Sequence, residues 1–196
     1  MIFVPLRLLA SFNTPVLRFC RTLGWMALAL MVVVTLLQVF MRYALNSAMA
    51  WPDEAARFLM LWMTGLMAPS AFRWGGFVAI EMLPEALPRR LGLGLHLALL
   101  LVALAVLVVG LVFGWGHAMG FGGNFNSSSL RIPLDWVGGE MVRVKLRYMY
   151  ASLLVGIGLM TLVCVELILR NLAALTDPDR ALPDNDRPAS FAPEAE

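Results

Sequence analysis

Residues 23–41, LGWMALALMVVVTLLQVFM, form a run of 19 residues without a charged side chain. Roughly 20 helical residues cross the hydrocarbon core of a bilayer, so this run is long enough to span a membrane. Outward from it, two more runs without charge occupy residues 91–119 and 148–165. The composition agrees, because 60% of the residues are hydrophobic and 14% are charged, with a mean hydropathy of +0.78. A soluble domain of this length needs a more polar surface, so the sequence indicates an integral membrane protein.

A fourth apolar run is shorter, because only 15 residues separate Arg57 from Arg73, or about 22 Å of helix. It can still cross if both arginines extend toward the lipid headgroups, and a re-entrant segment is the alternative. We therefore expect an all-α fold with a short interfacial helix after the first span and four transmembrane helices at about 20–43, 56–80, 91–119 and 148–170. They form one membrane domain, residues 1–175, followed by a disordered tail, residues 176–196, that is rich in Pro, Asp and Glu.

The segment Trp51-Pro52-Asp53-Glu54 has the pattern of a helix start. Proline suits the first helical turn, and two carboxylates there complement the positive end of the helix dipole. Arg57 lies four residues after Asp53 and three after Glu54, so an ion pair along one helix face is available to either acid. A helix cap with a surface ion pair would explain this pattern, and so would a contact with another subunit.

Two further groups of polar residues lie near the ends of the predicted spans. Gln38 and Arg42 are four residues apart and share one face at the end of the first span. An amide in this position favours packing against another helix over exposure to lipid. After the second span, Arg73, Gly75 and Glu81 provide a base, a turn residue and an acid. An ordinary loop with charges at the membrane boundary is the simpler interpretation of this second group.

The residues give little support to catalysis. The two histidines, His96 and His117, are 21 residues apart on one predicted helix, about 32 Å, and cannot bracket one haem. Cys20 and Cys164 lie on different predicted helices and form no Cys-x-x-Cys pair. No metal-ligand, Ser-His-Asp or phosphate-loop spacing occurs, and the basic residues are scattered rather than gathered into one patch. We predict a protein that is not an enzyme, with no cofactor, no metal site and no nucleic-acid partner.

Residues 51–57, WPDEAAR, and residues 73–81, RWGGFVAIE, together form a pattern that resembles the small membrane subunit of tripartite ATP-independent periplasmic (TRAP) transporters, the DctQ-type family. The resemblance covers about a quarter of the chain, and Phe77 stands where the family usually has His. Trp51 and Glu54 match the most recurrent positions of the family, which implies a role for them at a subunit contact.

The resemblance also implies a division of labour. A large, multi-spanning membrane subunit would carry the sodium and substrate sites, and a periplasmic substrate-binding protein would deliver an organic acid anion. The present chain would bind no substrate and would act as a scaffold among membrane lipids. The family implies the bacterial inner membrane with both termini in the cytoplasm, and nine Lys and Arg residues then lie on the cytoplasmic side against six outside. The alternatives are the small subunit of a tripartite tricarboxylate transporter and a four-helix subunit that anchors haem or quinone in a respiratory enzyme.

One segment departs from the family pattern. Ten residues, 137–146, intervene between the family's usual lead-in sequence and the last apolar run. Apolar and basic residues alternate strictly over 142–147, with Val142, Val144 and Leu146 on one side and Arg143, Lys145 and Arg147 on the other. This segment is predicted to be either a short amphipathic helix on the membrane surface or a strand.

Overall fold

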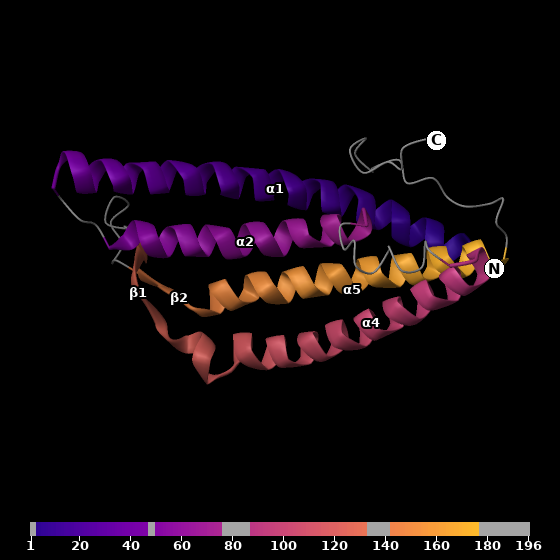
Figure 1. The fold of residues 1–196 in the computed structure, drawn as a ribbon. Coiled ribbons are helices and arrows are strands. Elements are labelled where there is room, and N and C mark those ends of the chain that lie inside the picture. The colour runs from indigo at the N-terminus through magenta and orange to yellow at the C-terminus, as the bar shows by residue number, and fades with distance from the viewer. Residues whose placement is uncertain (1–2, 47–49, 76–86, 133–141, 177–196) are drawn as a thin grey trace. The chain divides into compact units, whose positions relative to one another are not determined.

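Four α-helices and two short strands make up most of the chain that the structure describes (Figure 1). The structure is a computed structural model, and it describes residues 3–46, 50–75, 87–132 and 142–176. In chain order the elements are α1 (Phe3–Ala44), α2 (Trp51–Arg73), α4 (Arg89–Met119), the 3-10 helix η1 (Phe121–Asn124), β1 (Asn126–Ile132), β2 (Val142–Lys145) and α5 (Arg147–Thr176).

Within the described residues, three helices are long and apolar enough to cross a membrane, namely α1, α4 and α5. The helix α2 has 23 residues but is less apolar, because it includes Arg57, Arg73 and several small polar residues. The predicted helical membrane fold is thus confirmed in its coarse form. A membrane crossing by α2 stays a prediction.

The first helix is much longer than the span expected from about residue 20. It begins at Phe3 and continues through Pro15 without interruption. Proline inside a helix removes one backbone hydrogen bond and crowds the preceding turn. Leu6 and Leu17, on either side, are both 1% exposed, and their packing stabilises the turns next to the proline.

The connection between α1 and α2 and the end of the chain also differ from expectation. Among the described residues no separate interfacial helix follows α1, because the helix that begins at Trp51 is α2 itself and runs to Arg73. The helix α5 continues to Thr176, past the predicted end near residue 170. Apart from Thr176, the predicted tail, residues 176–196, lies outside the described residues.

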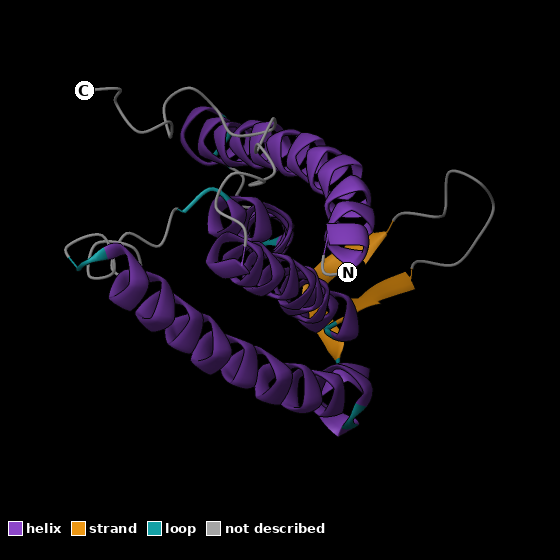
Figure 2. Cartoon of the chain, turned by 90° about the vertical axis from the view of Figure 1, so that its right-hand side faces the viewer, coloured by secondary structure: helices purple, strands orange, loops and turns teal. Residues whose placement is uncertain are grey.

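The strands β1 and β2 form an antiparallel pair that leads into α5 (Figure 2). The Cα partners are Asn126 with Lys145, Arg131 with Arg143, and Ile132 with Val142, with a shift in register between the first two pairs. Side chains of a strand alternate between its two faces, which explains the alternating apolar and basic residues of 142–145. The strand alternative is confirmed for Val142–Lys145, where the amphipathic-helix alternative is wrong. The strand ends before the predicted alternation does, because Leu146 lies in a turn and Arg147 begins α5. Residues 137–141 lie outside the described part.

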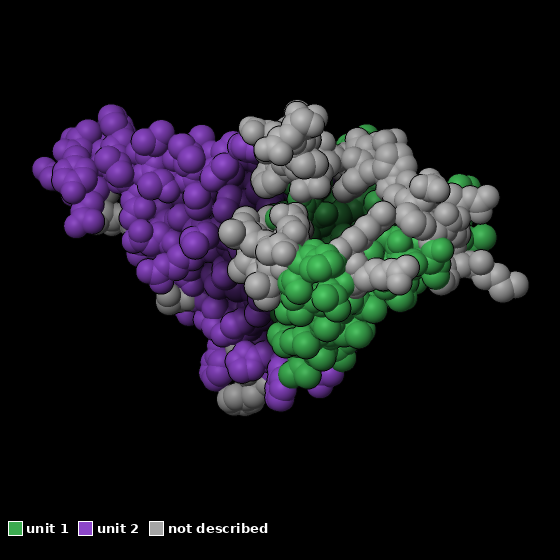
Figure 3. Space-filling view, turned by 45° about the vertical axis from the view of Figure 1, so that its right-hand side comes forward, with its two compact units in different colours: residues 1–19, 68–110, 157–196 green, residues 20–67, 111–156 purple. Residues whose placement is uncertain are grey.

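The chain divides into two compact units, which Figure 3 colours separately. Unit 1 comprises residues 1–19, 68–110 and 157–196, and unit 2 comprises residues 20–67 and 111–156. Each unit therefore takes segments from several helices. The hydrophobic core of unit 1 consists of buried side chains from α1, α2, α4 and α5, namely Leu17, Phe72, Leu100, Val163 and Cys164.

In unit 2, the backbones of α2 and α5 come into direct contact. A Cβ atom added to Gly156 would lie 2.8 Å from the Cα atom of Gly65. A Cβ atom added to Gly65 would in turn collide with the carbonyl oxygen of Ser152. Small residues of this kind let membrane helices approach closely, so this contact depends on glycine at both positions.

Candidate functional site

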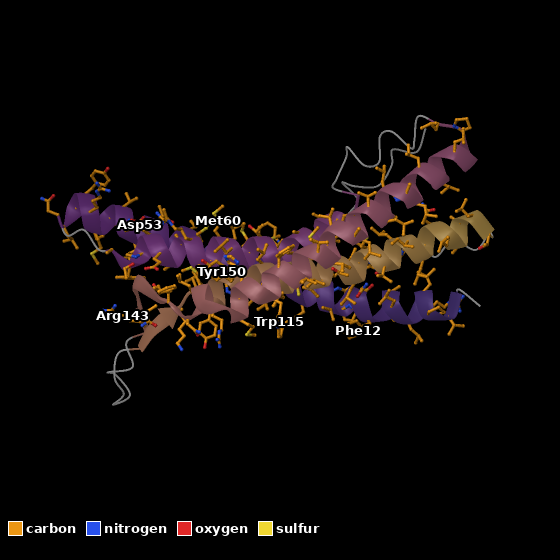
Figure 4. All side chains as sticks on the ribbon, turned by 90° about the horizontal axis from the view of Figure 1, so that it is seen from below. Phe12, Asp53, Met60, Trp115, Arg143 and Tyr150 are labelled. Carbon is orange, nitrogen blue, oxygen red and sulfur yellow. The ribbon has the colours of Figure 1, made fainter. Side chains whose placement is uncertain are left out.

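The helix start predicted from Trp51-Pro52-Asp53-Glu54 is present, because α2 begins at Trp51 and carries both acids in its first turn. Pro52 is fully buried. Its missing N–H costs nothing there, because the first turn of a helix has no internal acceptor for that group. Asp53 is exposed (Figure 4). The two neighbouring carboxylates therefore occupy different environments, and Glu54 is the one that makes specific contacts.

The Glu54 carboxylate, in unit 2, accepts hydrogen bonds from β1. Its Oε1 atom accepts from the hydroxyl of Ser127 at 2.5 Å. Its Oε2 atom accepts from the backbone N–H of Ser129 at 2.7 Å and of Leu130 at 3.0 Å, and also from the Ser129 hydroxyl. One side chain in the first turn of α2 thereby fixes the course of β1, which lies more than 70 residues later in the sequence.

These contacts change the pKa of Glu54. Burial alone would raise the pKa, but hydrogen bonds from the hydroxyls of Ser127 and Ser129 and from the N–H groups of Ser129 and Leu130 outweigh burial. Together they lower the pKa of Glu54 from 4.5 to about 2. The group is therefore negatively charged near neutral pH, which also suits its place at the N-terminal end of a helix.

The other residues of this motif are more accessible to solvent. Trp51 is half-buried, and Asp53 and Arg57 are exposed. No ion pair joins Asp53 to Arg57, although both lie in the described part of α2. Near the C-terminal end of α1, and also in unit 2, Gln38 is half-buried and Arg42 is exposed. The ion pair that the spacing makes available is thus not formed between Asp53 and Arg57 in the described residues, and Glu54 is held by serine hydroxyls and backbone N–H groups.

Arg73, the last residue of α2, belongs to a buried network in unit 1. Its Nε and Nη2 atoms donate to Glu166 Oε1 at 3.2 and 2.8 Å, and its Nη1 atom donates to Thr14 Oγ1 at 3.0 Å. Arg170, one turn after Glu166, donates to the same Oε1 atom from Nε and Nη2 at 3.0 and 2.8 Å. The other oxygen of Glu166 accepts from Asn13 Nδ2 at 2.7 Å. A single carboxylate therefore joins α1, α2 and α5.

This network is almost closed to solvent. The side chains of Arg73 and Glu166 are 2% and 0% exposed. Removing one partner from a buried ion pair costs about 3–5 kcal/mol, because the other charge stays buried without its partner. The network is therefore a strong constraint on which segments of α1, α2 and α5 can pack together in unit 1.

The two remaining predicted site residues lie after α2. Gly75 has a φ of 80°, in the left-handed region that glycine adopts readily. Its N–H donates to the carbonyl of Phe72 at 3.3 Å, which closes a turn at the end of the helix. Glu81 lies outside the described residues, so its predicted relation to Arg73 is a prediction still.

Sequence reasoning missed Glu166, Asn13 and the two serines that hold Glu54. Glu166 could have been found, since it is the sole acid between residues 141 and 176 and precedes Arg170 by four positions. The asparagine and the serines gave no comparable signal, because such residues are common and their partners are 73 to 153 residues away.

The Glu54 contacts in unit 2 join α2 to β1, and the Glu166 network in unit 1 joins α1, α2 and α5. In both places the polar groups are hydrogen bonded to one another. Within the ranges that the structure describes, no group of three or more His, Cys, Asp and Glu residues is placed to hold a metal ion. Three helices that are long and apolar enough to cross a membrane define a multi-pass integral membrane protein.

Comparison with known families then assigns the chain more closely. The family model described as "Tripartite ATP-independent periplasmic transporters, DctQ component" matches residues 31–174. The chain belongs to this family, and it is thus a small permease subunit of a TRAP transporter. A Haemophilus influenzae protein that carries the name TRAP transporter small permease protein is 36% identical over 61 residues, which are 31% of this chain and 38% of that relative. No solved structure matches the chain.

Proposed function

We propose that this chain is the non-substrate-binding subunit of a sodium-dependent TRAP transporter that imports an organic acid anion, and that it serves as a scaffold for the large transport subunit. The proposal rests on how the buried charges are used. Both oxygens of Glu166 are engaged by Asn13, Arg73 and Arg170. A substrate or ion site needs polar groups that can turn toward a ligand. Groups bonded to one another in this way support a rigid bracing role instead.

The proposed partners are a large multi-spanning membrane subunit, a periplasmic substrate-binding protein and the surrounding lipids. Gln38 supports the first of these, because a half-buried amide on an apolar span is better satisfied by another helix than by lipid. Arg42, Trp51 and Arg57 would contact the large subunit from the same unit of the chain. Glu54 would act through β1, which it holds in place.

We further propose that α2 is a fourth crossing in the bacterial inner membrane and that both termini are cytoplasmic. The nine-to-six distribution of basic residues favours this orientation. Four crossings put the two termini on the same side, whereas three crossings put them on opposite sides. Cysteines introduced at Ser11 and Ser190 should both be shielded from a membrane-impermeant reagent in intact cells, and a cysteine at Asn126 should react. Labelling of either terminal cysteine alone would show that α2 does not cross.

The scaffold role is tested by reconstitution. Vesicles that contain this chain alone should show no solute uptake under a sodium gradient. Uptake should appear when the large subunit and the binding protein are added, and it should decrease when this chain is omitted. Glu166→Gln should reduce recovery of the large subunit in a mild-detergent purification, with the exposed Arg143→Gln as a matched control. Sodium-driven uptake by the isolated chain would overturn the proposal.

A further inference from the structure

The hairpin of β1 and β2, in unit 2, presents two cations that the fold itself does not use. Arg143 and Lys145 are exposed, whereas Val144 between them is half-buried, as expected for alternate residues of a strand. Figure 4 labels Arg143. Within the described part of the chain, neither an ion pair nor a side-chain hydrogen bond reaches either cation. The two residues therefore share one face of β2, about 6.5 Å apart along the strand, and their charges are available to a partner.

The hairpin that carries these cations is fixed to the rest of unit 2. Glu54 on α2 accepts a hydrogen bond from the N–H of Ser129 in β1 at 2.7 Å. Directly after β2, the N–H of Leu146 donates to the carbonyl of Phe125, just before β1, at 2.9 Å. Groups that are held in place before binding lose little conformational freedom when they bind. The cationic face of β2 is therefore better suited to recognition than two lysines or arginines on an unsupported loop.

Positive charge prevails in this part of the chain when every residue is counted, described or not. Unit 2 as a whole contains seven Lys and Arg against four Asp and Glu, and residues 126–147 contain four against two. In the orientation proposed above, residues 126–147 are exported. Short exported loops are usually poor in Lys and Arg, because positive charge favours the cytoplasmic side. Attraction of an acidic partner explains this excess, whereas membrane insertion does not.

This segment is also where the chain departs from the common pattern of its family. Ten residues, 137–146, intervene before the last apolar run, and β2 lies within them. A segment beyond the shared pattern is not needed for what all members of the family do. It suits contact with a partner that is particular to this transporter.

We propose that the face of β2 that carries Arg143 and Lys145 docks an acidic patch on the periplasmic substrate-binding protein of this transporter. The inference rests on the proposed function, which supplies that partner, and it adds the surface at which the partner meets this chain. Sites for small ligands enclose most of the ligand, so two exposed cations on a strand suit a protein surface better than a free organic anion. Charges at the rim of such a contact mainly raise the rate of association and make it sensitive to salt.

The test measures binding of the substrate-binding protein to the complex of this chain with the large subunit, held in nanodiscs of phosphatidylcholine. One exposed ion pair changes an equilibrium about 1.4- to 5-fold, so Arg143→Gln with Lys145→Gln should weaken binding roughly 2- to 30-fold. Glutamate at both positions should weaken it further. Most of the change should lie in the association rate, which should also become less sensitive to salt.

Two control variants separate charge from structure. Exchanging the two residues, as Arg143→Lys with Lys145→Arg, keeps both charges and should leave binding unchanged. Arg7→Gln removes an exposed cation from unit 1 and should also leave binding unchanged. In the reconstituted system, the Gln double variant should need more binding protein for half-maximal uptake and should reach the native maximal rate. Its recovery of the large subunit should equal that of the native chain.

The alternatives give different results. If the native complex binds the protein and takes up solute, and both double variants do so equally well, the surface assigned to β2 is wrong and the scaffold function stands. Uptake that stays low at saturating binding protein would place the two cations in transport itself and overturn the inference. Retention of phosphatidylglycerol that falls in the Gln variant, with protein binding unchanged, would assign them to lipid headgroups instead. A native complex that binds no periplasmic protein would overturn both proposals.

Discussion

Glu166→Gln removes one negative charge from the buried network of unit 1 while leaving its volume almost unchanged. In the native chain Glu166 Oε1 accepts four hydrogen bonds, two from Arg73 and two from Arg170. The Arg73 side chain is 2% exposed and cannot regain water without unpacking α2. We expect a loss of about 3–5 kcal/mol in the free energy of unfolding. Against a total of roughly 5–15 kcal/mol, that loss is large.

The measurement is thermal unfolding in detergent, followed by the fluorescence of the six tryptophans. A loss of this size corresponds to a fall of about 6–20 °C in the unfolding temperature. Arg170→Gln is the graded comparison, because that side chain is 20% exposed and its loss should cost less. The double substitution Arg73→Met with Glu166→Leu removes both buried charges and should recover most of the lost stability. An unfolding temperature of Glu166→Gln within 2 °C of the native value would refute this reasoning.

Three other predictions concern unit 2. Glu54→Ala should lower the unfolding temperature and speed amide hydrogen exchange in β1, because its carboxylate accepts hydrogen bonds from that strand. Asp53→Ala should lower the free energy of unfolding by only about 0.3–1 kcal/mol, since it loses only a favourable interaction with the helix dipole. Equal effects of the two substitutions would contradict a special role for Glu54. Because folding lowers the pKa of Glu54 from 4.5 to about 2, its contribution to stability should be complete above pH 4.5 and decline as the pH falls toward 2. Unfolding of the native chain and of Glu54→Gln should be measured between pH 4.5 and 2, and the loss of stability that comes from Glu54 should be missing in the variant. Gly156→Ala should be destabilising because its Cβ would lie 2.8 Å from Gly65, while Gly116→Ala, with nothing within 4 Å, should be nearly neutral in the same unfolding assay.

The sequence predicted those features that local chemistry determines. The segment Trp51-Pro52-Asp53-Glu54 correctly predicted the start of α2, because proline and acidic residues are each favoured in the first turn of a helix. Three long apolar runs likewise identified α1, α4 and α5. The alternation over 142–147 was compatible with a strand, and Val142–Lys145 forms one because β1 is present to pair with it.

What the sequence could not predict depends on partners that are distant along the chain. Pro15 would ordinarily weaken a helix, yet α1 passes through it, and Leu6 and Leu17 on either side of the proline are both buried. The sequence spacing made an ion pair between Glu54 and Arg57 available, whereas in the structure Glu54 accepts a hydrogen bond from the hydroxyl of Ser127, 73 residues away. Hydrogen bonds of such range are decided by tertiary packing, which a local pattern does not encode.

The bond between Arg73 and Glu166 also constrains the order in which the protein can be built. The two residues are 93 positions apart, so at about 5–20 residues per second the ribosome adds Glu166 roughly 5–20 seconds after Arg73. Throughout that interval Arg73 and Asn13 lack the acceptor that they share in the finished chain. The network of unit 1 can therefore form only after α5 has been made, and in a chain that stops before α5 the Arg73 guanidinium would lack the Glu166 carboxylate.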